Sequence, residues 1–133
     1  MGRGISDALR DYVGEYLRSV VVYTRDDYHV RYLRDDVAVD YDDAEIERGI
    51  EEMRFEALEA EYVNDLFAER HGDLRCNVTF FEDAVELNFP LSETTGLAVA
   101  VDAGYFAQQD SFVQHVLDCF DDVDAIESQY MSE

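Results

Sequence analysis

The chain alternates between stretches whose apolar residues recur at helical spacing and shorter stretches in which apolar residues run together or alternate with polar ones. The first pattern is typical of amphipathic helices and the second of strands. Together they predict helices over residues 6–18, 43–70 and 110–120, and strands over 19–24, 28–33, 74–81, 84–89 and 97–102. The predicted order of elements is therefore α-β-β-α-β-β-β-α.

The longest helical stretch, residues 43–70, is apolar on two sides. One stripe holds Ile46, Ile50, Met53, Ala57 and Ala60, and the other holds Phe55, Leu58, Tyr62, Val63, Leu66 and Phe67. A helix of this kind often covers a core with one stripe and meets a partner with the other. Asp42 and Glu45 have the spacing of a capping box at its start. The alternative is that Gly49, or a break near residue 54, divides the stretch into two helices.

The strand predicted over residues 97–102 has no charge in its interior, which favours a central and buried position. The residues expected in the core are Val20, Val22, Leu87, Phe89, Leu97, Val99, Val101, Val116 and Phe120. Alternation along the second strand would place Tyr28, Val30 and Tyr32 on one face. Residues 35–42 are expected to form a polar link, and residues 121–133 an acidic and partly frayed tail.

A two-strand hairpin, one long helix and a three-strand meander resemble, as topology over nearly the whole chain, the roadblock/profilin-like architecture. The resemblance implies an α+β fold with a five-stranded antiparallel sheet in the order 2-1-5-4-3. The central helix would cover one face of this sheet and the terminal helices the other. PAS-type sensor domains share the strand order, but they usually carry several short helices where this chain has one long helical pattern.

Composition indicates one domain, residues 1–133, that works in concentrated salt. The formal net charge is −22, and all ten basic residues are Arg. Such a charge destabilises a compact state in dilute buffer, whereas molar salt shortens the Debye length to about 3 Å. An acidic chain without Lys resembles the proteins of haloarchaea, which accumulate salt in the cytosol. No apolar run approaches the roughly 18 residues that cross a membrane, so we expect a cytoplasmic protein.

Four residues are weak candidates for a metal site. His115 and Cys119 are four apart on the last predicted helix, and His71 and Cys76 flank the start of the third strand. They could form a Cys₂His₂ set, but the spacing is irregular and no C-x-x-C is present. Surface histidines and buried, reduced cysteines explain the same residues more simply, so we expect no metal and no cofactor.

The first hairpin interleaves arginines with aromatic residues. Arg25, Arg31 and Arg34 occur among Tyr28, His29 and Tyr32, a mixture that can stack bases and hold phosphates. The net charge repels nucleic acid, and molar salt weakens phosphate contacts. A salt-bridged sheet face, or a contact with an acidic protein, is therefore favoured. No nucleophile elbow, phosphate loop or distinct pair of carboxylates predicts an enzyme.

The favoured function is a non-enzymatic scaffold or regulatory module that acts through protein–protein contact. The topological resemblance implies this class, because roadblock-type proteins are dimeric platforms for other proteins. The third strand would be an edge strand with no residue to block it, beside the second stripe of the long helix. We therefore expect the chain to form a homodimer and to bind a further, unknown protein partner. The candidate interface residues are Phe55, Tyr62, Phe67, Cys76, Val78 and Phe80. A PAS-like small-ligand sensor and, less favoured, an enzyme with an unrecognised site are the alternatives.

Overall fold

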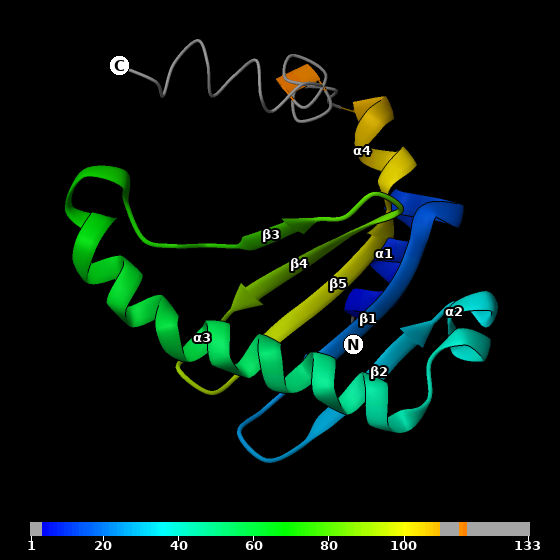
Figure 1. Cartoon of the computed structure of the whole chain (residues 1–133), viewed down its shortest axis with the longest axis horizontal. Coiled ribbons are helices and arrows are strands. Elements are labelled where there is room, and N and C mark those ends of the chain that lie inside the picture. Colours follow the sequence, from blue (N-terminus) through cyan, green and yellow to red (C-terminus); the bar gives the residue numbers. More distant parts are fainter. Residues whose placement is uncertain (1–3, 110–114, 117–133) are drawn as a thin grey trace, which may run out of the picture.

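A computed structural model describes residues 4–109 and 115–116 of the chain. Its centre is one antiparallel sheet in the order β2-β1-β5-β4-β3, which confirms the predicted strand order (Figure 1). The strands are β1 (Leu17–Tyr23), β2 (Tyr28–Leu33), β3 (Asn77–Phe80), β4 (Ala84–Pro90) and β5 (Gly96–Asp102). β5 pairs with β1 on one side and β4 on the other, as expected for the most apolar strand.

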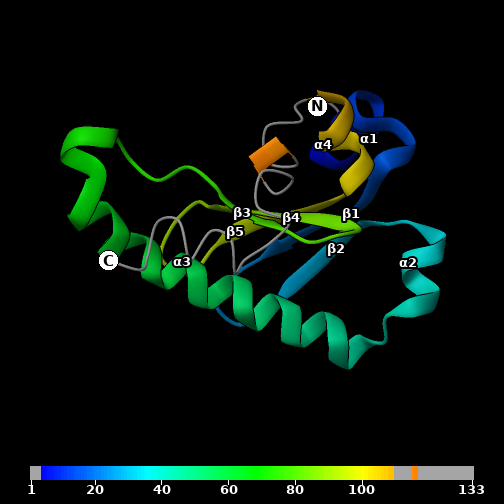
Figure 2. The same cartoon turned by 45° about the horizontal axis from the view of Figure 1, so that its top comes forward.

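The helices lie on both faces of this sheet. They are α1 (Ile5–Val13), α2 (Asp35–Asp40), α3 (Asp43–His71) and α4 (Ala103–Gln109), with a 3₁₀ turn, η1 (Gly14–Tyr16), between α1 and β1. α3 crosses one face, and α1 and α4 cover the other (Figure 2). α2 connects the end of β2 to the start of α3.

α3 is one continuous helix of 29 residues, so neither Gly49 nor residue 54 divides it. The predicted capping box is present at its start. The Glu45 backbone N–H donates to Asp42 Oδ1 at 2.8 Å, and the Asp42 N–H donates to Glu45 Oε1 at 3.2 Å. The helix ends at Gly72, whose φ of +81° suits a residue without a side chain and whose N–H donates to the carbonyl of Ala68.

The sheet separates two apolar layers. Towards α1 and α4 the buried residues are Leu17, Val20, Val85, Val99 and Val101, with Leu9, Val13, Tyr105 and Phe106 packed against them. Towards α3 they are Val21, Tyr23, Ala98, Ile50 and Ala57, with Ile46 and Met53 beside them.

A β-bulge in the β1–β2 pair divides the aromatic residues of β2 between the two faces. Val20 pairs with Tyr32 and Val21 with Val30, so Arg31 is an extra residue. Tyr28 packs in the α3 layer, whereas Tyr32 packs in the opposite layer with the Arg10 guanidinium 4.8 Å from its ring centroid. The prediction that Tyr28, Val30 and Tyr32 share one face was therefore wrong, because one inserted residue reverses the alternation.

Several predicted boundaries were also wrong. The first helix ends at residue 13 rather than 18, because Gly14 takes a φ of +69° and caps it. The expected link over residues 35–42 contains α2, and the third strand shrinks from 74–81 to 77–80. α4 was not predicted. The helix expected over 110–120 falls mostly outside the described residues, of which 115–116 are helical.

The predicted core was correct in its centre. Val20, Val99 and Val101 are buried, and Val22, Leu87, Phe89 and Leu97 are partly buried. Val116, which we expected inside, is 37% exposed. Tyr105 and Phe106 of α4 already cover the sheet face that Val116 was expected to cover. Phe120 lies outside the described residues.

Candidate functional site

A groove lies between α3 and the face of the sheet that α3 crosses. We call it the α3 groove. Its volume is about 430 Å³, which lies in the range of small-molecule sites. The strands contribute Ser19, Val21, Val30, Leu33, Thr79, Glu86 and Ala98, and Phe81 follows β3. α3 contributes Glu45, Ile46, Gly49, Ile50, Glu52, Met53 and Glu56, and the lining is completed by Val37 of α2 and Tyr41.

Glu86 lies in the sheet face of this groove. On β4 it is paired with Thr79 of β3 and Ala100 of β5, so neighbouring strands fix its backbone. Burial raises the pKa of the Glu86 carboxyl, although the charge of Arg18 acts in the opposite direction. Within the part of the chain that the structure describes, the side-chain carboxyl of Glu86 forms no hydrogen bond or ion pair. Glu86 is thus a largely buried carboxylate that borders the α3 groove.

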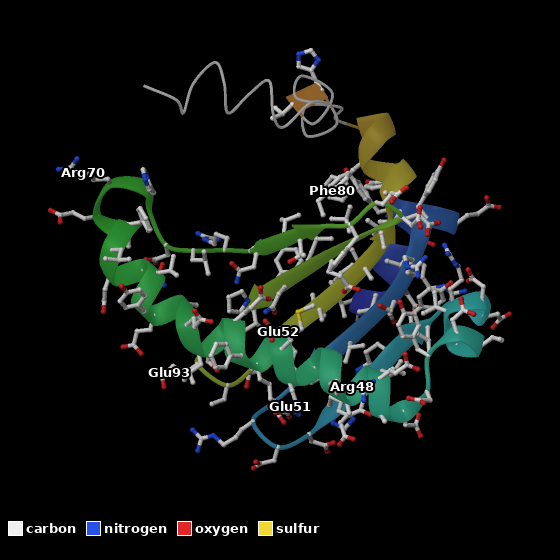
Figure 3. The ribbon with its side chains drawn as sticks, viewed as in Figure 1. Arg48, Glu51, Glu52, Arg70, Phe80 and Glu93 are labelled. Atoms are coloured by element: carbon white, nitrogen blue, oxygen red, sulfur yellow. The ribbon has the colours of Figure 1, made fainter. Side chains whose placement is uncertain are left out.

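The wall formed by α3 adds further negative charge. Glu45, Glu52 and Glu56 all line the groove, and none of its lining residues in the described structure is Arg, Lys or His. In Figure 3, Glu52 lies on the side of α3 that faces the strands, and Glu51 lies on the opposite side. The groove therefore combines an apolar lining with charge of one sign.

A polar network joins the sheet to α3 next to the groove. The Tyr23 hydroxyl donates to Asn88 Oδ1 at 2.6 Å, and Asn88 Nδ2 donates to Glu56 Oε1 and to the Met53 carbonyl, both at 3.0 Å. A Cβ at Gly96 would overlap the Tyr23 hydroxyl, so this position requires Gly. Burial raises the pKa of Tyr23. With its hydrogen bonds satisfied and its members buried, the network has a structural role.

A second candidate surface lies on the other side of α3. Phe55, Leu58, Tyr62 and Leu66, which we call the apolar stripe, are each between 58% and 65% exposed. They follow Glu51 by 4, 7, 11 and 15 positions, so helical periodicity places them on the side of Glu51, away from the groove. A row of large, exposed apolar side chains makes this side of α3 a candidate interaction surface.

The outer edge of β3 is the third candidate. β3 is the last strand of the sheet and pairs only with β4. The Phe81 N–H donates to the carbonyl of Ala84 at 2.8 Å, so the alternation of an antiparallel ladder directs the Val78 N–H to the open edge. The Val78 side chain is 54% exposed. This edge can accept another strand.

The structure separates the six interface residues named from the sequence. Phe55 and Tyr62 lie on the apolar stripe, and Val78 lies at the β3 edge. Phe67 is exposed on a different side of α3, where its ring stacks on His71 with centroids 5.6 Å apart. Phe80 is partly buried against the core below α4 (Figure 3). Cys76 is also partly buried, which raises the pKa of its thiol and keeps it protonated.

The metal and hairpin candidates are likewise dispersed. Among residues 4–109 and 115–116, no three His, Cys, Asp or Glu side chains gather where they could hold a metal ion. His71 stacks on Phe67, His115 is exposed, and Cys119 lies outside the described residues. In the hairpin, Arg34 is bound to Asp102 and Asp36.

The groove was not predicted from the sequence, although a signal was present. In β4, Glu86 and Asn88 alternate with Val85, Leu87 and Phe89. This alternation gives a polar face to β4, which is second from the β3 edge of the sheet and therefore an interior strand. A polar face on an interior strand is either covered by another element or borders a cavity. The path of α3 across that face determines whether the polar side chains are covered or border a cavity, and the sequence does not specify this path.

These features define a small α+β domain, with a five-stranded antiparallel sheet and a long helix packed against it. The family model described as a domain of unknown function, DUF7522, matches residues 3–121, so the chain belongs to the DUF7522 family. A search of curated proteins found no match to the chain. No helix in the described residues is long and apolar enough to cross a membrane.

Proposed function

We propose that the protein is a non-enzymatic, homodimeric interaction module whose two copies meet through the apolar stripe of α3. The observation that carries this proposal is the stripe itself. Phe55, Leu58, Tyr62 and Leu66 are exposed in a continuous row, on a helix whose opposite side already packs on the sheet. Burying such a row against a second copy removes its apolar area from water.

The stripe suits a two-fold contact. If two α3 helices pack antiparallel about an axis near residue 60, Phe55 of one copy faces Leu66 of the other, and Leu58 faces Tyr62. The same axis brings Glu51 of one copy opposite Glu69 of the other, because Glu69 follows Glu51 by five full turns of the helix. These like charges repel, but molar salt screens the repulsion, so it costs the dimer little.

The β3 edge is separate from the stripe, and we assign it to the protein partner. An edge strand binds an extended segment through main-chain hydrogen bonds. The Val78 N–H is directed outward and would be one of the donors. Support for a platform of this kind also comes from the strand order 2-1-5-4-3, which the chain shares with roadblock-type proteins. Its acidic, Lys-free composition suits a salt-rich cytosol like that of haloarchaea.

Light scattering in molar KCl tests the proposal. The wild type is expected at the mass of a dimer. Tyr62→Asp places a charge in the centre of the stripe and should give a monomer of unchanged circular dichroism. Val39→Asp is the matched control, because Val39 is exposed on α2, away from the stripe. It should leave the dimer intact.

Val78→Pro distinguishes the stripe from the β3 edge. Proline removes the outward N–H and leaves the β3–β4 ladder in place. The dimer mass should remain unchanged in this variant. A monomeric wild type would refute the proposal. A dimer that survives Tyr62→Asp but dissociates in Val78→Pro would show that the copies pair through β3 instead.

A further inference from the structure

We infer that the α3 groove binds a small organic cation, in which an amine or guanidine is attached to an apolar body. This site is distinct from the proposed dimer contact, because the groove and the apolar stripe lie on opposite sides of α3. Three properties of the groove support it, namely its size, its apolar lining and its charge of one sign.

The size and lining suit an apolar ligand body. A volume of about 430 Å³ is enough for a small organic molecule. Val21 and Ala98 contribute from the sheet, and Ile46, Ile50 and Met53 contribute from α3. A ligand seated between these two walls removes their exposed apolar surface from water, which is favourable.

Glu86 supplies the charged group that such a ligand would meet. It projects from a strand in the interior of the sheet, so its position is fixed, and its carboxylate has no partner in the described residues. Arg18, the cation that acts on it, donates instead to Asp102 Oδ1 at 3.1 Å. A partly buried charge without a direct partner gains from an ion pair with a ligand.

The charge of the groove selects against other ligand classes. Glu45, Glu52 and Glu56 on the wall would repel an anion. A neutral ligand would cover Glu86 and leave its carboxylate both desolvated and unpaired. A bare metal ion is disfavoured, because the described residues offer no group of three potential ligands. An organic cation can form an ion pair with the Glu86 carboxylate while its apolar body packs against the apolar walls.

A set of three probes of similar shape tests the site. Phenethylamine, 2-phenylethanol and 3-phenylpropionate carry the same phenyl group with a positive, a neutral and a negative end. Each is titrated into the full chain in molar KCl and followed by amide NMR shifts. Phenethylamine should shift residues of the groove, such as Gly49 and Ala98, and should bind about tenfold more tightly than the alcohol. The carboxylate should show no binding.

Two variants assign the binding to the groove. Glu86→Gln should weaken phenethylamine about tenfold and leave the alcohol unchanged, whereas Glu82→Gln, in the exposed β3–β4 turn, should change neither. Gly49→Leu fills the groove from α3, where no atom lies within 4 Å of a new Cβ. It should abolish binding of both probes while the helix gains stability, since Leu favours helices over Gly.

Several outcomes would overturn the site. They are absence of amine binding to the wild type, equal affinity for the amine and the alcohol, unchanged amine affinity in Glu86→Gln, and binding that persists in Gly49→Leu. The dimer is tested separately, because a monomeric wild type that binds the amine would refute the dimer and retain the site.

Discussion

The guanidinium of Arg34 holds both carboxylate oxygens of Asp102. Nη1 donates to Oδ2 at 2.7 Å and Nη2 donates to Oδ1 at 3.0 Å. Arg34 follows β2 and Asp102 ends β5, so this bidentate pair joins two strands that β1 separates. Arg18 of β1 adds a third donor to the same carboxylate, and Asp36 of α2 accepts from the other edge of Arg34.

Asp102 should make the stability of the protein depend on acid pH. Hydrogen bonds from Arg34 hold the pKa of Asp102 below its ordinary value. A carboxylate whose pKa is lowered on folding stabilises the fold above its unfolded pKa of about 3.9, and this is lost as pH falls through the folded pKa. Asp102→Asn should cost about 1 kcal/mol at pH 7, because the pair is partly exposed and screened by salt.

Urea unfolding in molar KCl at pH 7 and at about pH 3 measures this effect. The difference between wild type and Asp102→Asn should narrow at the lower pH, because the carboxyl of the unfolded chain, with a pKa of about 3.9, is then largely protonated and stabilises the unfolded state. Asp73→Asn is the control, since Asp73 is exposed in the loop after α3. A difference that stays constant between the two pH values would contradict the assignment.

Val99 tests the central position of β5. It is 6% exposed in the layer below α1 and α4, whereas Val39 on α2 is 85% exposed. Val99→Ala should lower the free energy of unfolding by about 1–3 kcal/mol, through lost burial and a residual cavity. Val39→Ala should change it by no more than about 0.5 kcal/mol. Equal effects of the two substitutions in urea unfolding would show that β5 is not central.

The elements of this fold were predictable where one pattern ran long enough. α3 has a capping box, two apolar stripes and Gly72 at its end, and these signals agree. β1, β2, β4 and β5 were found because each is a short apolar or alternating run. The strand order came from the resemblance of the topology to a known architecture, since periodicity alone does not specify which strands pair.

Local features with no periodic signal were missed. The bulge at Arg31 inserts one residue and moves Tyr32 to the other face. Nothing in the sequence of β1 or β2 indicates that a bulge occurs there. α2 is too short for a helical period to be recognised, and its acidic residues led to the prediction of a polar loop between β2 and α3. The first helix was extended to residue 18 because Leu17 continued its stripe, although Gly14 ends it.

The candidate sites were predictable only in part. The exposed positions Phe55 and Tyr62 followed from the second stripe of α3, which a single core could not bury. The sequence did not indicate that the stripe and the β3 edge lie on different surfaces, because that depends on how α3 is rotated about its axis. The groove depends in addition on the path of α3 across the sheet, which the side chains of several elements determine together.

The net charge should make folding depend on salt. A chain with 32 acidic and 10 basic residues repels itself in dilute buffer. Molar KCl reduces the Debye length to about 3 Å and screens this repulsion. Circular dichroism should therefore show loss of structure in dilute buffer that is recovered in molar KCl. Equal melting temperatures at low and high salt would refute the adaptation to salt that the composition indicates.

One pair of carboxylates offers a local test of the same effect. Glu61 lies on α3 and Glu93 lies in the loop between β4 and β5, at the lower left of Figure 3. A hydrogen bond with Glu93, together with the repulsion between the two charges, raises the pKa of Glu61. The fold therefore binds a proton there more readily than the unfolded chain, and stability falls as pH rises through that raised pKa.

Glu93→Gln should relieve this repulsion between α3 and the loop. At pH 7 and low salt the variant should melt at a higher temperature than wild type, and the gain should disappear in molar KCl. It should also shrink as pH falls through the raised pKa of Glu61, because the wild type then binds a proton there and the repulsion is lost. Glu82→Gln removes the same charge from the β3–β4 turn, away from Glu61, and controls for the change in net charge. If both variants gain equally at low salt, the effect belongs to the total charge and the Glu61–Glu93 pair has no special part in it.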